Sequence, residues 1–327
     1  MTVVDIHTHM FGNSWLDMLH KHGGPTYSAG TMEDGRDYLV EKGATACALE
    51  KEAFDYDARI VAMNEHGIDV SIVSLTSPNV YWGGEEVSAK TAQLANDEMA
   101  AGQIAYPDRI RWFASLPFEY PDKAIAELNR ALEKGAVGVM VTASINGKHL
   151  IDPLFKPVWA EINKHALPVL VHPTAPFGAN EAEFGIERIL MPGAGFMFDT
   201  TIGIARMAVD GFFERFQDLK VIASHGGGYI PYVNGRVDMF FQVETLVKMK
   251  IDKLPSEYFS CIYYDAVLYD PGALSLCIDI AGPEKVLFGT DFPMPCDVPK
   301  LYDMIGTRPA DEAKAIKGGN AIKMFGL

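Results

Sequence analysis

The chain has 327 residues, of which 48% are hydrophobic and 22% are charged, and its formal net charge is -15 at pH 7. The length suits one large domain or two ordinary ones, and the composition is that of a globular protein with a sizeable core. The acidic balance disfavours nucleic acid and anionic membranes as partners, because both are bound by basic patches. A small anionic substrate stays open, since a few cations in a pocket would suffice.

The cysteines and the apolar segments bear on the compartment. The four cysteines show no CxxC spacing, which in a long chain favours reduced thiols. No apolar run approaches the roughly 18 residues of a membrane span, and the N-terminus has no signal-peptide pattern. We therefore expect a soluble, cytoplasmic protein.

Strand-like segments recur along the chain, and helix-like segments separate them. Several are continuously apolar, as parallel strands buried on both faces are. In chain order they are VVDIH (3–7), VSIVSL (70–75), IRWFASLP (110–117), VGVMVTAS (137–144), LPVLVHP (167–173), LKVIASH (219–225), FSCIYYDAV (259–267) and KVLFGTDFP (285–293). This alternation predicts an α/β fold, a (β/α)8 TIM barrel. A doubly wound open sheet is the alternative.

The intervening segments carry helix signals. The segment 121–135 has Asp122 as a candidate N-cap and Gly135 as a C-terminal stop, and 155–168 repeats this plan. The stretch 12–60 is long for a connection from strand to helix, so we predict an insertion after the first strand, or a lid over the site. No linker rich in Pro, Gly or Ser divides the chain, so residues 1–327 are expected to form a single domain.

Histidines and an aspartate stand where predicted strands end. The first strand ends in His7 and His9, the fifth in His172, the sixth in His225 and the eighth in Asp291. The C-terminal ends of barrel strands form the active-site face, and side chains two apart on a strand share a face. A lone histidine there is more often a core residue, but the joint pattern predicts a divalent metal site with a position left for water, as in catalytic zinc sites. Its ligands would be His7, His9, His172 and Asp291.

These strand ends belong to longer motifs. They include VDIHTHMF (4–11), FDYDARIVAMNEHGIDVSIVS (54–74), FERFQDLKVIASHGGGYIPYVNGRVD (213–238), YYDAVLYDPGALSLCID (263–279), VLFGTDFPMP (286–295) and GGNAIKMFGL (318–327). Through them the chain resembles the amidohydrolase superfamily nearly end to end, and more narrowly its amidohydrolase 2 branch, typified by α-amino-β-carboxymuconate-ε-semialdehyde decarboxylase. The resemblance implies zinc bound by His7, His9, His172 and Asp291. His225 is then the acid/base residue beside the metal-bound water.

The resemblance also bears on assembly and on the number of metal ions. Arg236 follows His225 by eleven residues, and in relatives this arginine reaches the active site of a neighbouring subunit and binds a substrate carboxylate. This implies a homodimer with Arg236 shared across the interface; a surface salt bridge is the alternative. Binuclear superfamily members carry a carboxylated lysine at the end of strand four, whereas Lys148 lies several residues beyond that end. We predict one metal ion, Zn²⁺, with Mn²⁺ as the alternative.

The expected substrate-binding residues depart from the branch pattern. The typifying decarboxylase holds a second substrate carboxylate with an arginine slightly before the segment that matches FDYDARI, and here Cys47 or Ala48 falls near that position. Lys51 is the nearest cation. Trp82 and Phe292 would suit a planar apolar substrate, although each could equally belong to the core.

The combined pattern predicts an enzyme with no organic cofactor. The first hypothesis is a metal-dependent, non-oxidative decarboxylase of a small unsaturated or aromatic carboxylic acid, a carbon–carbon lyase. Zinc lowers the pKa of bound water to about 7, His225 beside Asp291 would exchange protons, and Arg236 would anchor a carboxylate. The alternative is a hydrolase of an amide, ester, lactone or carbon–carbon bond, or a hydratase, at the same site. A third hypothesis is a non-catalytic metal-binding scaffold, against which His225 argues.

Overall fold

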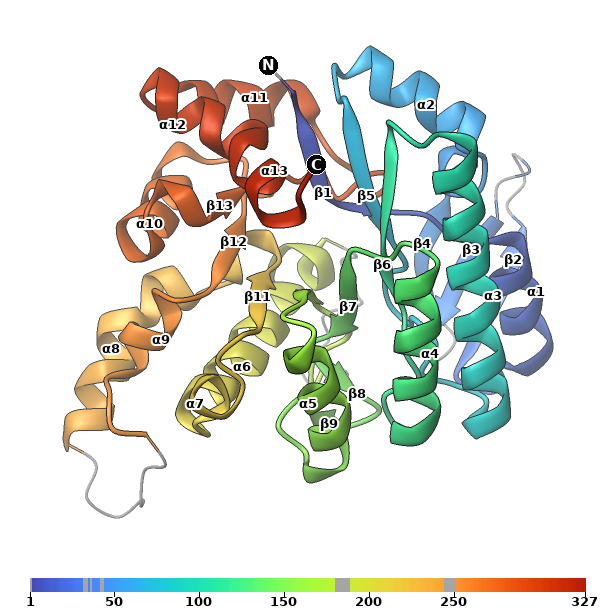
Figure 1. Ribbon diagram of the computed structural model, residues 1–327, viewed down its shortest axis with the longest axis horizontal. Coiled ribbons are helices and arrows are strands. Elements are labelled where there is room, and N and C mark those ends of the chain that lie inside the picture. Colours follow the sequence, from blue (N-terminus) through green and yellow to red (C-terminus); the bar gives the residue numbers. More distant parts are fainter. Residues whose placement is uncertain (1, 32–34, 36, 42–43, 180–188, 244–250) are drawn as a thin grey trace.

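The computed structural model describes residues 2–31, 35, 37–41, 44–179, 189–243 and 251–327. Eight parallel strands form one sheet in the order β1-β5-β6-β7-β10-β11-β12-β13, with helices around it (Figure 1). The strands are β1 (Val4–His9), β5 (Val70–Ser74), β6 (Ile110–Ala114), β7 (Gly138–Thr142), β10 (Pro168–His172), β11 (Lys220–Ala223), β12 (Tyr263–Asp265) and β13 (Val286–Leu287). Each lies within or overlaps one of the predicted strands, and the predicted barrel is confirmed.

Backbone hydrogen bonds between β1 and the segment after β13 bring the two ends of the sheet together. The amide of His9 donates to the carbonyl of Phe292 at 2.7 Å, and the amide of Asp291 donates to the carbonyl of His7 at 2.8 Å. An open sheet would leave edge groups of this kind without strand partners. The closure therefore excludes the doubly wound alternative.

One apolar cluster fills the axis of the barrel. It takes a side chain from each of seven strands, namely Ile6, Ile72, Phe113, Met140, Leu170, Ile222 and Leu287, all of them fully buried. Side chains from strands on opposite sides of a barrel can meet only at its axis. A larger cluster lies between the strands and the helices. At about 1.5–3 kcal/mol for each large apolar side chain, these clusters supply most of the favourable free energy of folding.

A register shift in β1 places two consecutive side chains inside the barrel. Side chains on a regular strand alternate between faces, yet Ile6 belongs to the axial cluster and His7 to the polar network at the strand ends. The pairing of β1 with β5 shifts between Asp5 and Thr8. Such a bulge re-aims side chains, and here it brings both His7 and His9 to the inner face.

Helices cover the outside of the barrel (Figure 1). They are α2 (Tyr56–Glu65), α3 (Gly84–Ala105), α4 (Pro121–Glu133), α5 (Lys156–Lys164), α6 (Phe196–Val209), α7 (Phe212–Arg215), α8 (Ile230–Val243), α9 (Pro255–Phe259), α10 (Pro271–Ala281), α11 (Val298–Gly306), α12 (Ala310–Lys314) and α13 (Asn320–Phe325). The predicted N-cap at Asp122 is wrong: Tyr120 is the N-cap of α4, because Pro121 takes the first helical position. Gly135, with φ of +98°, follows this helix as predicted.

The segment between β1 and α2 carries additional structure. It contains α1 (Asn13–His22) and a three-stranded antiparallel sheet of β2 (Tyr27–Thr31), β3 (Asp37–Glu41) and β4 (Ala44–Leu49). The predicted insertion 12–60 thus includes this sheet and ends inside α2; its role as a lid stays a prediction. A second small sheet pairs β8 (Ser144–Ile145) with β9 (Lys148–His149). Within the described ranges, no helix combines the length and the apolar character that crossing a membrane requires.

Candidate metal centre

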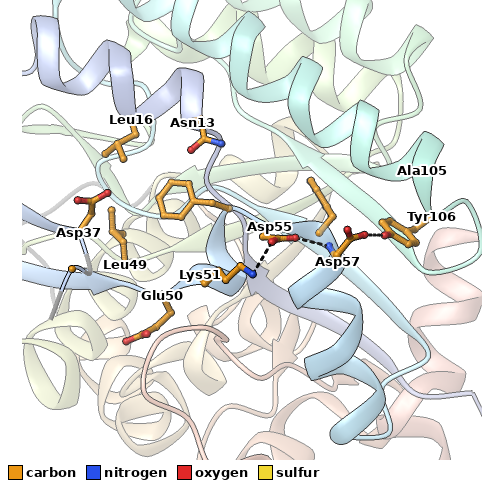
Figure 2. A pocket seen from close by; sticks show the side chains of 13 residues that line it. Asn13, Leu16, Asp37, Leu49, Glu50, Lys51, Asp55, Asp57, Ala105 and Tyr106 are labelled. Atoms are coloured by element: carbon orange, nitrogen blue, oxygen red, sulfur yellow. Dashed lines mark hydrogen bonds and ion pairs between the residues drawn. The ribbon is translucent and has the colours of Figure 1, made fainter. Parts of the chain in front are cut away.

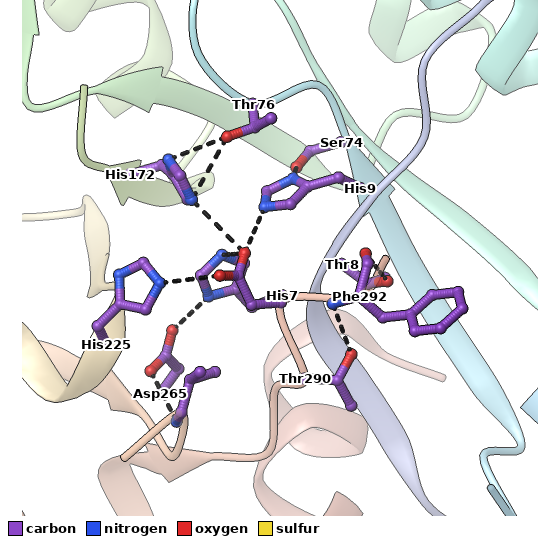
Figure 3. A network of polar contacts seen from close by, with 12 residues as sticks. His7, Thr8, His9, Ser74, Thr76, His172, His225, Asp265, Thr290 and Phe292 are labelled. Carbon is purple, nitrogen blue, oxygen red and sulfur yellow. Dashed lines mark hydrogen bonds and ion pairs between the residues drawn. The ribbon is translucent and has the colours of Figure 1, made fainter. Parts of the chain in front are cut away.

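Four histidines meet at the C-terminal ends of the strands (Figure 3), and Asp291 lies among them. His7 and His9 lie at the end of β1, His172 ends β10, and His225 and Asp291 follow β11 and β13. The ring centroid of His7 lies 5.0–5.1 Å from those of the other three histidines. All five residues of the predicted constellation therefore come together at one rim of the barrel.

The carboxylate of Asp291 is the centre of this arrangement. Its Oδ1 lies 2.9 Å from Nε2 of His9, 3.2 Å from Nε2 of His7 and 3.8 Å from Nε2 of His172. Its Oδ2 lies 3.3 Å from Nε2 of His225. All four imidazoles thus turn the same ring nitrogen toward one carboxylate.

The donor set fits a divalent metal ion. Nε2 of His7 is buried and makes no hydrogen bond within the described part of the chain. Imidazole nitrogen and carboxylate oxygen are ligands that zinc, manganese and related ions accept. Among the described residues, one group has ligand atoms within 4.8 Å of one another and has the composition of a divalent metal site: His7, His172, His225 and Asp291.

This group differs in one residue from the predicted ligands. It includes His225, which was predicted as the acid/base residue, and not His9, whose Nε2 contacts Asp291. The division of roles between His9 and His225 stays a prediction. Lys148, the lysine considered for a second metal, pairs instead with Glu119 at 2.9 Å.

Asp265, at the end of β12, is a site residue that was not predicted. Its Oδ2 lies 2.6 Å from Nδ1 of His7, and both side chains are fully buried. Its Oδ1 accepts the amides of Gly226 and Val267 at 3.0 and 3.1 Å. A carboxylate in this position fixes the tautomer of an imidazole ligand and raises its basicity. The strand-end rule would have found Asp265, since it lies within the predicted strand FSCIYYDAV.

The other histidines differ in how their second ring nitrogen is held. Nδ1 of His172 lies 2.8 Å from the carbonyl oxygen of Pro173, and Nδ1 of His9 lies 3.3 Å from Oγ of Ser74. Nδ1 of His225, in contrast, is buried and hydrogen-bonds to none of the described residues. His225 is therefore the imidazole whose tautomer is least constrained by the protein.

Burial and mutual charge set the protonation of this cluster. Burial alone would lower the pKa of His7, but Asp291 and Asp265 outweigh it and raise this pKa to about 10. Burial lowers the pKa of His172 to about 3 and also lowers the pKa of His9. Burial would raise the pKa of Asp291, yet His7 and the neighbouring imidazoles hold it well below its usual range. Carboxylate and neutral imidazole are the forms that bind a cation, which would displace the proton from His7.

The backbone at the site takes rarely populated conformations. His225 and Asp291 have φ of +50° and +62°, a region that costs a residue other than glycine on the order of 1–3 kcal/mol. Gly228, the last glycine after His225, has φ of +63°, and a Cβ there would lie 2.2 Å from the carbonyl oxygen of Met197 on α6. The glycine run thus permits close packing of the turn that carries His225.

Lys51 lies outside this centre. It lines a pocket of about 670 Å³ beside α1 and the C-terminal end of α3, and none of the described lining residues is a histidine (Figure 2). The Lys51 side chain is 76% exposed and its Nζ lies 3.2 Å from Oδ2 of Asp55. The structure thus does not bring Lys51 to the metal centre, and its predicted contact with a substrate stays a prediction.

The two predicted aromatic contacts are placed differently. Trp82 is buried, and its Nε1 donates to the carbonyl of Asn79 at 3.2 Å; its contact with a substrate stays a prediction. The ring of Phe292 points away from the histidines (Figure 3). The guanidinium of Arg59 lies 4.6 Å from the centroid of this ring. The predicted packing of Phe292 on a substrate ring stays a prediction.

Arg236 lies on α8 with its side chain exposed. Its guanidinium covers the ring of Phe240, 4.9 Å from the ring centroid. Its predicted reach into a neighbouring subunit stays a prediction.

Comparison with known proteins identifies the family. The family model described as amidohydrolase matches residues 4–327. A 2-amino-3-carboxymuconate-6-semialdehyde decarboxylase from Dictyostelium discoideum is 29% identical over 99% of this chain and 91% of the relative. A gamma-resorcylate decarboxylase from Polaromonas sp. (strain JS666) is 30% identical over 83% of this chain and 87% of the relative.

Solved structures show the same fold. The crystal structure of a dihydroxybenzoic acid decarboxylase from Polaromonas sp. JS666, with bound manganese and the inhibitor 2-nitroresorcinol, has a TM-score of 0.81 and 24% sequence identity. The match covers 100% of this chain and 97% of that one. Together with the family match over almost the whole length, this agrees with the resemblance seen in the motifs. The chain belongs to the amidohydrolase family.

Proposed function

We propose that this protein is a metal-dependent, non-oxidative decarboxylase of a small aromatic or unsaturated carboxylic acid. The observation that carries the proposal is the cluster of four imidazoles around Asp291 at the C-terminal rim of the barrel. A relative that aligns with 99% of this chain is a decarboxylase. The curated relatives confirm the predicted reaction class, a carbon–carbon lyase. Their substrates, a carboxymuconate semialdehyde and gamma-resorcylate, indicate the substrate class.

His7, His172 and Asp291 would hold one divalent ion, with His9 or His225 as a further ligand. We propose Zn²⁺, and Mn²⁺ is the alternative because this donor set suits both ions. A bound divalent ion supplies a Lewis acid that stabilises negative charge developing on the substrate.

His225 is the proposed proton donor. Loss of CO₂ leaves the bonding electron pair on the substrate carbon, and one proton must be delivered there to form the C–H bond. Imidazole is the most common general acid and base among protein side chains, and the second ring nitrogen of His225 is not tied to any described residue. This freedom distinguishes His225 from His7, whose tautomer Asp265 fixes.

Arg236 is the proposed anchor for the substrate carboxylate, acting across a homodimer. Exposed apolar side chains flank it on one face of α8, at the three- and four-residue spacing of a helix. They are Tyr232, Met239, Phe240 and Val243, with exposed fractions of 83%, 42%, 50% and 61%. These exposed apolar side chains around Arg236 support the pairing of α8 with a second copy of this chain. We also propose a cytoplasmic location, which agrees with the free thiols of Cys261, Cys277 and Cys296.

A hydrolase or hydratase remains the alternative, because it would use the same site. The test is to strip the metal, reload the protein with Zn²⁺ or Mn²⁺, and supply gamma-resorcylate, 2-amino-3-carboxymuconate-6-semialdehyde and related acids. CO₂ release that stops on chelation is the expected result. A change in ultraviolet absorbance without CO₂, together with ¹⁸O from water in the product, would favour the alternative.

A further inference from the structure

Arg59, on the inner side of α2, is a buried cation that the proposed mechanism does not use. Its side chain is 1% exposed, and burial lowers its pKa from 12.5 to about 10. Its three hydrogen bonds go to a hydroxyl and two carbonyls: Nη1 donates to Oγ1 of Thr8 at 2.7 Å, Nη2 donates to the carbonyl of His9, and Nε donates to the carbonyl of Glu52 at 3.2 Å. A buried charge is costly unless such contacts satisfy it.

These contacts converge where β1 meets the segment that carries Asp291. Oγ1 of Thr8 donates to the carbonyl of Phe292 at 2.9 Å, and the amide of His9 donates to the same carbonyl at 2.7 Å. The Phe292 ring lies against the guanidinium of Arg59, which stacks on its face. Arg59 therefore holds both sides of this junction, through Thr8 and His9 on one side and Phe292 on the other.

Asp291 needs such support because of its backbone. It lies directly before Phe292 with φ of +62°, a conformation that persists only where the surroundings impose it. On its other side, Oγ1 of Thr290 donates to Oδ2 of Asp5 at 2.7 Å. Asp291 is thus held between two buried polar contacts, one made by Asp5 and one by Arg59.

We infer that Arg59 is a positioning residue that sets the distance between His9 and Asp291 and so tunes metal affinity. The inference rests on the proposed metal site. It also explains why a helix that follows the insertion contributes a buried cation to the strand ends. Through the carbonyl of Glu52, Arg59 joins the segment after the insertion sheet to the metal centre.

The test compares the Mn²⁺ affinity of metal-stripped wild type with that of metal-stripped variants. The concentration of free Mn²⁺ in each titration is measured by electron paramagnetic resonance. Arg59→Met removes the donors and the charge, and Thr8→Val removes the hydroxyl link to Phe292 while keeping the side-chain shape. Partners that orient metal ligands typically contribute about 10–100-fold to affinity, so we expect R59M to weaken binding at least about tenfold and T8V to weaken it by a smaller factor.

Arg130→Met is the matched control. Arg130 is a partly buried arginine on α4 that pairs with Glu127 and Asp97, away from the metal centre. The R130M variant should have a lower melting temperature and an unchanged Mn²⁺ affinity. This control separates loss of stability from loss of positioning. Wild-type affinity in R59M would overturn the inference; if R59M does not fold, wild-type affinity in T8V would overturn it. Absence of Mn²⁺ and Zn²⁺ binding by the wild type would instead overturn the proposed metal site.

Discussion

Nδ1 of His7 lies 2.6 Å from Oδ2 of Asp265, and neither side chain is exposed to solvent. This contact orients the other ring nitrogen of His7 toward Asp291, 3.2 Å away. Asp265→Asn keeps the size of the side chain but removes its charge, so His7 becomes a weaker and less well oriented ligand. We expect the affinity for Zn²⁺ or Mn²⁺ to fall by about 10–100-fold.

Metal titration of the stripped protein measures this effect. Asp279→Asn on α10 is the control. This substitution also replaces one carboxylate by an amide, but at an exposed position. Equal affinities of D265N and wild type would show that the carboxylate does not tune the metal site.

His225 and Asp291 should separate catalysis from metal binding. His225→Asn is expected to retain one metal ion per chain and to lose about 10²–10⁴-fold in turnover, the usual contribution of a general acid or base. Asp291→Ala is expected to lose the metal, because it removes the carboxylate that all four imidazoles face. Metal content by mass spectrometry and CO₂ release are measured on the same samples. Loss of metal from H225N would make His225 a ligand, as its place within the 4.8 Å group allows.

The strand ends could be predicted because two simple rules combine there. Continuous apolar runs mark parallel strands, and the barrel brings all their C-terminal ends to one rim. His172 and His225 were placed in this way although more than fifty residues separate them. Asp265 obeys the same rule, but the rule does not tell that its carboxylate contacts Nδ1 of His7 instead of belonging to the ligand group.

Side-chain directions beyond the strand ends could not be predicted. β13 ends at Leu287, and Asp291 has a positive φ, so the alternation of faces no longer determines where Phe292 points. The position of Lys51 depends on the path of the insertion, for which no periodic pattern in the sequence is informative. The misplaced N-cap at Asp122 has a local cause, since Pro121 is preferred at the first helical position.

Mixing two inactive variants tests whether Arg236 acts across a dimer. Arg236→Ala leaves His225 intact, and His225→Asn leaves Arg236 intact. If the arginine serves the neighbouring site, a mixed dimer contains one complete site and regains a substantial fraction of wild-type activity. If it serves its own chain, mixing restores nothing. Sedimentation measures the oligomeric state, and a monomer at assay concentration would exclude a shared site.

Asp199, on α6, should make stability depend on pH. Its side chain is 3% exposed, and Oδ2 accepts the amide of Thr174 at 2.9 Å. Burial raises its pKa from 3.8 to about 6, although the contacts with Thr174 and Ser144 lower it in part. The folded state therefore binds this proton more tightly than the unfolded state does. The resulting stabilisation is fully present below about pH 4 and is lost as the pH rises through about 6.

Asp199→Asn removes this titration while keeping an acceptor for the Thr174 amide. The free energy of unfolding of D199N relative to wild type should therefore rise between pH 4 and pH 7, by up to about 3 kcal/mol at 1.36 kcal/mol per pKa unit. Urea denaturation at several pH values in this range measures the difference, with D279N as a control in which an exposed carboxylate is replaced in the same way. A pH-independent difference for D199N would mean that Asp199 ionises in the folded protein as readily as in the unfolded chain.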